Sequence, residues 1–405
     1  MLEGLIMSQA FEGITILDFT QVFAGPFAAM QLALLGAEVI KIEQPDTGDQ
    51  TRNLMSAEDE KALSPAFLAM NLNKKSLTLN LKSDQAKEIV KKLVLNTDVI
   101  IENFKAGTMT KLGLDYSTLK ELKPDLIYCS ITGYGQQGPK AGEGAYDGAI
   151  QAASGMMSQN GHEETGPTRT GFMPVDMSTA LNAAFSISAS LHRKAKTGQG
   201  QCIDVAMLDT AIVVQAAQFS NYLNQGRQLG LMGNVSPTGQ PTANVFATKD
   251  GFIQITALRQ NQVEKLFDAL GGSEDLKKPE FANPNVRAKN ASQVHDYLAE
   301  KLKQKTTLDW MDDLAKRGIP VAEIKNVPQV IADPQLEHRE VFASIASPNQ
   351  PNTEIKVVKA GYMASPDGPR VNAAPPLLSA DTQQILSTLG YSESDYADLK
   401  SNGVV

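Results

Sequence analysis

Apolar segments with strand character alternate with helical segments through the first 150 residues, and this alternation constrains the fold more than any other feature of the sequence. Strands are expected at 14–19, 37–42, 76–81, 99–102 and 126–131. Helices are expected between them at 28–35 and 83–95. Strand–helix–strand units join parallel strands through right-handed crossovers. The pattern therefore predicts an α/β fold whose main part is a doubly wound, Rossmann-like large domain.

A change of composition after residue 225 indicates a second domain. Gly, Asn, Pro and Gln are frequent in 225–244, as in a linker. The segment 245–255 has the pattern of a hairpin with its turn at Asp250 and Gly251, and helical segments follow it. We expect a large domain at 8–225, a smaller α/β or α+β domain at 226–325, and a linker with a C-terminal segment at 326–405.

Charge and composition argue against several classes of protein. With a net charge of −8 over 405 residues, the chain is not expected to bind nucleic acid, because such proteins usually carry a basic patch. No apolar run reaches the roughly 18 residues that span a bilayer. The amino end lacks the basic region of a secretory signal, and Met7 is the expected natural start. Cys129 and Cys202 fit a reducing, cytoplasmic setting as buried strand residues, and four scattered histidines predict no metal site.

A single carboxylate, Asp176, stands at the start of a run of small residues that extends to Leu191. Such a run predicts a helix packed closely against other backbone. Asp is a preferred N-cap residue, whose side chain accepts hydrogen bonds from free backbone N–H groups, and the positive end of the helix dipole would favour the ionised carboxylate. An ionised carboxylate at this place could serve as a covalent nucleophile or as a structural cap, and local sequence favours the cap.

Polar residues near the ends of the expected strands are candidates for binding a ligand. Arg52, at the end of a short loop, could contact a phosphate or lie in a surface turn. Lys74 and Lys75 could form a phosphate clamp or a solvated edge. Asn103 and Phe104 follow a strand directly, and ligands of open α/β sheets bind at the carboxyl ends of strands. Neither a dinucleotide-binding glycine pattern nor a serine-hydrolase elbow is present.

Ten short motifs occur in order along nearly the whole chain. They lie at 17–26, 36–43, 48–52, 73–76, 101–104, 133–139, 145–147, 174–185, 197–201 and 389–392. Each is short, but together they make the sequence resemble the class III CoA-transferases, also called the CaiB/BaiF family. That family includes formyl-CoA:oxalate and carnitine CoA-transferases. The motifs indicate the family and not the substrate.

The resemblance implies a large domain built from both chain ends, a small domain joined to it, and a homodimer in which two chains interlock like rings. Asp176 matches the family's catalytic aspartate. Its carboxylate is expected to attack an acyl-CoA thioester, giving a mixed anhydride and then an aspartyl-CoA thioester, before a carboxylic acid receives CoA. Coenzyme A would therefore be substrate and product, and no tightly bound cofactor is expected.

The resemblance also implies roles for residues around Asp176. Tyr146 and Asp147 match a pair beside the catalytic aspartate and would orient the acyl group or the reacting carboxylate. Phe23 replaces a glutamine of formyl-CoA:oxalate transferase, which implies a more apolar pocket. The glycine run of the oxalate-specific transferases is missing from 233–241, so neither that specificity nor that lid is expected. The expected CoA contacts are Arg52, Lys74, Lys75, Asn103, Phe104, Lys111 and Met207.

Two alternative functions stay open from the sequence. An α-methylacyl-CoA racemase has the same fold and CoA site, but racemisation needs an acid and a base that flank Cα. The racemases carry histidine where this chain has Tyr146, and tyrosine is a poor replacement, so transfer is favoured. The second alternative is a protein that binds CoA without turnover.

Overall fold

The chain forms two compact units in the computed structural model, which describes residues 9–54, 63–350 and 352–405. The large unit comprises the described residues of 1–156, 170–219 and 335–405, and the small unit comprises 157–169 and 220–334. The borders expected at 226 and 326 lie six residues after and nine residues before the observed ones at 220 and 335, and 157–169 belongs to the small unit. The expected start at Met7 lies outside the described residues.

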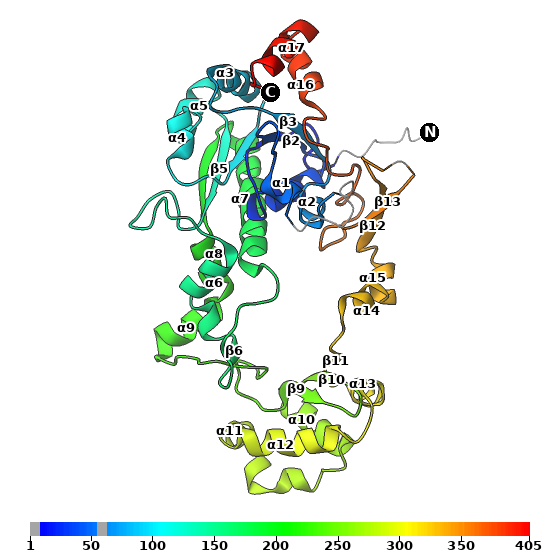
Figure 1. The fold of residues 1–405 in the computed structure, drawn as a ribbon. Helices are drawn as coiled ribbons and strands as arrows, with labels where there is room; N and C mark the ends of the chain where they lie inside the picture. Colours follow the sequence, from blue (N-terminus) through cyan, green and yellow to red (C-terminus); the bar gives the residue numbers. More distant parts are fainter. Residues whose placement is uncertain (1–8, 55–62, 351) are drawn as a thin grey trace. The chain divides into compact units, whose positions relative to one another are not determined.

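Six parallel strands form the central sheet of the large unit (Figure 1). In spatial order they are β3 (Lys74–Thr78), β2 (Glu38–Glu43), β1 (Thr15–Asp18), β4 (Val99–Glu102), β5 (Ile127–Thr132) and β8 (Gln201–Ala206). The strand order runs one way from β1 to β3 and reverses at β4. In doubly wound sheets, ligands bind at such a switch point, at the carboxyl ends of the strands. The predicted α/β class with a parallel sheet is confirmed.

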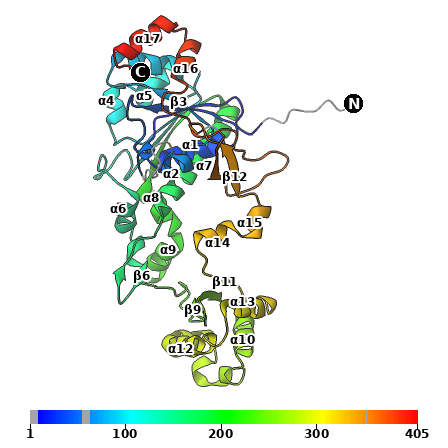
Figure 2. The same cartoon turned by 45° about the vertical axis from the view of Figure 1, so that its right-hand side comes forward.

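Helices cover both faces of this sheet, because both sets of alternating strand side chains are apolar. Leu17 packs into a cluster on one face and its neighbour Ile16 into a cluster on the other. The helices in the Leu17 cluster are α3 (Asp84–Val94), α4 (Thr108–Leu112), α5 (Tyr116–Leu122), α16 (Thr382–Thr388) and α17 (Glu393–Ser401). Figure 2 shows α16 and α17 beside α4 and α5, so that both ends of the chain build the large unit.

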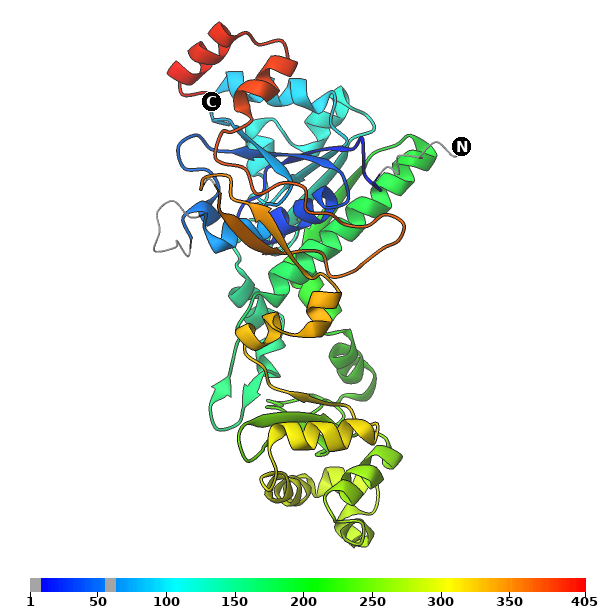
Figure 3. The same cartoon turned by 90° about the vertical axis from the view of Figure 1, so that its right-hand side faces the viewer.

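On the other face, small side chains allow two helices, α1 (Ala24–Ala33) and α7 (Pro174–Thr197), to pack closely together. Ala28, Ala29, Ala180 and Ala183 are fully buried there. Figure 3 shows α1 beside the long α7. This packing brings the amino-terminal residues of both helices to the same cavity.

Some elements depart from the sequence-based expectation. The helix expected from 208 divides at Gln215, whose side chain donates a hydrogen bond to the carbonyl of Ala211, and a separate helix follows. Cys202, expected to be buried, is exposed because β8 is an edge strand. The other elements of the large unit or at its borders are α2 (Pro65–Met70), α6 (Asp147–Ala153), α8 (Met207–Val214), α9 (Ala216–Gln225), α15 (Pro334–His338), β12 (Phe342–Ala346) and β13 (Glu354–Val358).

The small unit has an α+β arrangement around an antiparallel sheet. The sheet order is β11 (Val321–Glu323), β10 (Phe252–Thr256) and β9 (Ala243–Ala247), and β9 pairs with β10 as the expected hairpin. Phe246, Phe267 and Trp310 lie in its apolar core. Its other elements are β6 (Gly161–His162), β7 (Gly166–Pro167), α10 (Gln260–Ala269), α11 (Pro284–Lys289), α12 (Ala291–Leu302), α13 (Thr307–Lys316) and α14 (Val327–Ile331). Within the described parts of the chain, no helix combines the length and apolarity needed to cross a membrane.

Candidate active site

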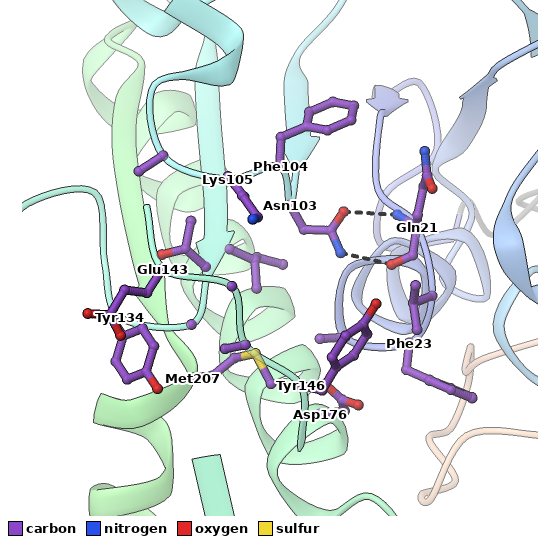
Figure 4. Close-up of a pocket in the computed structure, with 18 of the residues that line it drawn as sticks. Gln21, Phe23, Asn103, Phe104, Lys105, Tyr134, Glu143, Tyr146, Asp176 and Met207 are labelled. Carbon is purple, nitrogen blue, oxygen red and sulfur yellow. Dashed lines mark hydrogen bonds between the residues drawn. The ribbon is translucent and has the colours of Figure 1, made fainter. Parts of the chain in front are cut away.

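A cavity of about 310 Å³ opens at the carboxyl ends of β1, β4 and β5, at the switch point of the sheet. The segments that line it are 21–24 after β1, 103–106 after β4, 131–135 at the end of β5 and 142–146 before α6. Gln50 lines the cavity too, as do Asp176 from α7 and Met207 from α8, both labelled in Figure 4. All of these residues belong to the large unit. The cavity therefore lies where an open α/β sheet binds its ligand.

Asp176 is the third residue of α7 and not its N-cap, so the predicted capping role is wrong. The N-cap position is Met173, which makes no side-chain capping bond. The cap comes instead from Asp147, whose Oδ2 accepts hydrogen bonds from the backbone N–H groups of Val175 at 2.8 Å and Asp176 at 3.0 Å. Gln151 donates from Nε2 to the other Asp147 oxygen at 2.5 Å. Because Asp147 accepts the hydrogen bonds of these N–H groups, the Asp176 carboxylate does not cap the helix.

The Asp176 carboxylate is buried without a hydrogen-bond partner among the described residues. Only 9% of the residue is exposed. Burial, and to a lesser extent the nearby charge of Asp147, raise the pKa of Asp176 to about 7. From the sequence, the helix start is expected to favour the ionised form, whereas burial and Asp147 shift the pKa of Asp176 in the opposite direction. A carboxylate with no competing partner is available as a nucleophile once ionised.

The segments after β1 and β4 are joined by the side chain of Asn103. Its Oδ1 accepts a hydrogen bond from the Gln21 N–H at 2.9 Å, and its Nδ2 donates to the Gln21 carbonyl at 2.8 Å, as Figure 4 shows. Phe104 lines the cavity and also packs against the core, and Met207 is a buried part of the lining. These three expected CoA contacts therefore meet at one cavity, where Asn103 also holds the wall together.

Two of the aromatic residues that line the cavity, Tyr146 and Phe23, are expected from the sequence to orient the substrate beside Asp176. Tyr146 directly precedes α6 and is 70% exposed, and Phe23 directly precedes α1. Figure 4 shows both rings near Asp176. Asp147, the third residue expected to orient the substrate, does not line the cavity and contacts the backbone of α7 instead. Its position favours a role in placing Asp176 over a contact with the substrate.

Two of the expected phosphate contacts are occupied by internal partners. The Lys74 Nζ lies 2.8 Å from Asp18 Oδ2 and also donates to the Pro26 carbonyl and the Asn71 side chain, with the lysine side chain fully buried. Arg52 makes two hydrogen bonds to Glu43 at 2.8 and 2.7 Å, and its guanidinium lies over the Phe67 ring. The structure therefore argues against a phosphate-binding role for Lys74, and it gives Arg52 a structural one.

The other two expected phosphate contacts lie outside the cavity. Lys75 is exposed and pairs with Glu38 at 2.5 Å, near the amino ends of β3 and β2 and therefore at the edge of the sheet opposite the cavity. Lys111 is exposed on α4 and is not among the lining residues. Sequence reasoning missed Lys105, a lysine that does line the cavity. Its position directly after Asn103 and Phe104, beyond the carboxyl end of β4, is the signal that could have identified it.

Comparisons with known proteins extend over nearly the whole chain. The sequence profile of CoA-transferase family III matches residues 11–382. Human succinyl-CoA:glutarate CoA-transferase is 34% identical over 401 residues, covering 97% of this chain and 89% of that protein. The formyl-CoA:oxalate CoA-transferase of Streptomyces avermitilis is 30% identical, over 98% of this chain and 100% of that protein. A solved structure of a CaiB/BaiF family protein from Brucella suis matches with a TM-score of 0.84 and 33% identity, over 95% of this chain and 100% of that one.

Proposed function

Because the chain belongs to CoA-transferase family III, we propose that it moves CoA from an acyl-CoA to a carboxylic acid through covalent intermediates on Asp176. The observation that carries this proposal is the Asp176 carboxylate itself. It is buried, lines the cavity at the switch point, and has no hydrogen-bond partner within the described part of the chain. A carboxylate kept in this state has no evident structural task, whereas it suits nucleophilic attack.

The proposed reaction proceeds by exchange of acyl bonds. The Asp176 carboxylate attacks the thioester carbonyl, so that a C–O bond forms, the C–S bond breaks, and a mixed anhydride and CoA thiolate result. The thiolate then attacks the aspartyl carbonyl and releases the donor acid as its carboxylate, leaving an aspartyl-CoA thioester. The acceptor carboxylate reverses these steps. No proton is consumed overall, and the burial of Asp176 limits hydrolysis of the activated aspartate.

The cavity lining guides the choice of substrates to test. Relatives are named for the acyl donors succinyl-CoA and formyl-CoA and for the acceptors glutarate and oxalate, so we propose short carboxylic acids as the first candidates. Phe23, Tyr146 and Met207 make part of the lining apolar. A panel of mono- and dicarboxylic acids with acetyl-CoA and succinyl-CoA as donors, read by mass spectrometry of the CoA products, would identify the pair.

A homodimer is part of the proposal and is supported by an apolar surface on the large unit. Leu181 and Phe185 on α7 and Val213 and Val214 on α8 are each more than half exposed. Exposed apolar patches of this kind are typical of protein–protein interfaces. We expect a dimer by light scattering, and Phe185→Glu should weaken it. A cytoplasmic location stays a prediction.

Trapping of the covalent intermediate tests the function directly. The protein would be incubated with an acyl-CoA and then with hydroxylamine, and the Asp176 peptide should appear as its hydroxamate in mass spectrometry. Asp176→Asn should give none. Exchange of solvent deuterium into the α position without trapping would favour α-methylacyl-CoA racemase instead. Binding of CoA with no turnover, unchanged in Asp176→Ala, would favour a binding protein.

A further inference from the structure

The part of the cavity wall that follows β1 contains a residue in an unfavourable backbone conformation. Gln21, Val22 and Phe23 form this part of the wall, and Val22 has φ +71°. The left-handed region is disfavoured for residues with a side chain, and most of all for β-branched ones. Such a conformation persists only where surrounding contacts enforce it, and it is typical of functional sites.

A buried ion pair provides the contact that enforces it. Asp49 Oδ1 accepts a hydrogen bond from the Val22 N–H at 3.2 Å, and Asp49 Oδ2 pairs with Lys41 Nζ at 2.8 Å. Lys41 Nζ also donates to the Thr20 carbonyl at 2.7 Å. Both side chains of the pair are completely buried. Asp49 therefore contacts the segment 20–23 without lining the cavity itself.

The residues on both sides of Val22 are fixed by other groups. The Thr20 N–H donates to Asp18 Oδ1 at 2.9 Å, and Asn103 holds both backbone polar groups of Gln21. After Phe23 the chain enters α1, where a Cβ at Gly25 would lie only 2.3 Å from the Thr20 side chain. Between these fixed points, the Val22 conformation sets how the chain passes from Gln21 to Phe23, which lines the cavity together with Asp176.

We propose that Asp49 is a positioning residue for CoA transfer, which holds Val22 in the left-handed conformation and thereby shapes the wall that places the acyl group against Asp176. The inference rests on the proposed transfer function. Without the Asp49 acceptor, Val22 relaxes to a conformation with negative φ, and the wall moves. Small errors in the placement of reacting groups lower the rate of the chemical step far more than they weaken binding.

A cycle of variants separates this role from a general structural one. Asp49→Asn leaves one amide oxygen, which the buried Lys41 ammonium will take, so the NH2 group is turned toward the Val22 N–H. It is also turned toward Thr51, whose N–H and hydroxyl donate to Asp49 Oδ1 at 2.9 and 2.8 Å, but that loss is the same whatever residue stands at 22. Asp49→Asn would be combined with Val22→Gly and with Val22→Ala in the full-length protein. Glycine adopts φ +71° without cost, whereas alanine does not, although both remove the valine side chain. Each pair is assayed with the donor and acceptor that react fastest in the substrate panel.

The expected result is a dependence of the Asp49 effect on residue 22. With Val22 or with Val22→Ala, Asp49→Asn should lower kcat about tenfold or more while the KM for acyl-CoA changes less than about threefold. With Val22→Gly, the same substitution should lower kcat less than about threefold. An equal loss of kcat in all three backgrounds, or a loss carried by KM, would overturn the proposal. If wild-type protein transfers CoA and the cycle is additive, only this inference fails and the proposed function stands.

The buried charge of Lys41 could prevent folding of Asp49→Asn, and a second variant covers that case. Lys41→Met with Asp49→Leu replaces the ion pair by apolar side chains, a change that proteins often tolerate, and it also removes the acceptor for Val22. The same comparison of Val22, Val22→Ala and Val22→Gly would be made in this background. Rescue of kcat by glycine alone supports the proposal, and equal activity of the three contradicts it.

Discussion

Replacing Asp176 by asparagine should stabilise the protein, and the gain should depend on pH. The folded structure raises the pKa of Asp176 from 3.8 to about 7, so the folded state keeps a proton that the unfolded chain loses. Stability therefore falls as pH rises from about 3.8, and the penalty is complete above pH 7. At about 1.4 kcal/mol for each tenfold change in an ionisation constant, the penalty is about 4 kcal/mol at pH 8 and about 1.7 kcal/mol at pH 5.

Asparagine is neutral at every pH and does not carry this penalty. The free energy of unfolding of Asp176→Asn should therefore exceed that of the wild type by more at pH 8 than at pH 5. The difference between the two pH values should be about 2.5 kcal/mol. The measurement is urea unfolding followed by circular dichroism at the two pH values and one protein concentration. Trp310, the only tryptophan, lies in the small unit, and its fluorescence transition should stay unchanged as an internal reference.

Asp209→Asn is the matched control for this experiment. Asp209 occupies the third position of α8, as Asp176 does in α7, but it is exposed. Its replacement should give no comparable gain in stability at pH 8. A gain for Asp176→Asn that is equal at both pH values, or equal to that of the control, would refute the electrostatic reasoning.

Three further predictions concern the charges around the cavity. Asp147→Asn keeps an acceptor for α7 but removes a negative charge, so the pKa of Asp176 should fall. The acidic limb of the kcat/KM profile should then move to lower pH, and an unmoved limb would contradict an electrostatic effect of Asp147 on Asp176. Lys74→Met leaves the buried Asp18 carboxylate without its lysine and should lower the free energy of unfolding, measured in urea, by about 3–5 kcal/mol. The KM for acyl-CoA should stay nearly unchanged in the folded enzyme. A large rise in KM at normal stability would show instead that Lys74 contacts the ligand. Lys105→Met should raise the KM for acyl-CoA about tenfold, since a hydrogen bond to a charged group contributes about 1.5–3 kcal/mol, whereas the exposed Lys82→Met should leave it unchanged.

The fold and the family could be predicted from the sequence because both depend on short local patterns. β4 has the expected bounds, Val99–Glu102, since strands of a parallel sheet are buried on both faces and read as short apolar runs. Likewise the hairpin of β9 and β10 follows from one Asp-Gly turn. The resemblance to class III CoA-transferases is confirmed by the family match over residues 11–382.

Two of the wrong predictions concern residues whose partners are far away in the sequence. Asp176 has the residue type and place of an N-cap, but the acceptor that caps α7 is Asp147, 29 positions earlier. From the sequence, Lys74 is expected to be an accessible charge, whereas in the structure it pairs with Asp18, 56 positions earlier. Local sequence shows which groups are charged, whereas only the packed structure shows which charges are already paired.

The assembly of the large unit from separate parts of the chain also bears on synthesis. The side chain of Asp381 accepts a hydrogen bond from the Ser76 N–H at 2.8 Å, and the Asn80 N–H donates to the Val404 carbonyl at 2.8 Å. These contacts at β3 cannot form until Asp381 and Val404 have left the ribosome. The small unit, which lies mostly in one segment at 220–334, can fold earlier. We therefore expect the nascent chain to expose the flank of β3 until these residues emerge, and a chain without residues 402–405 to mature more slowly.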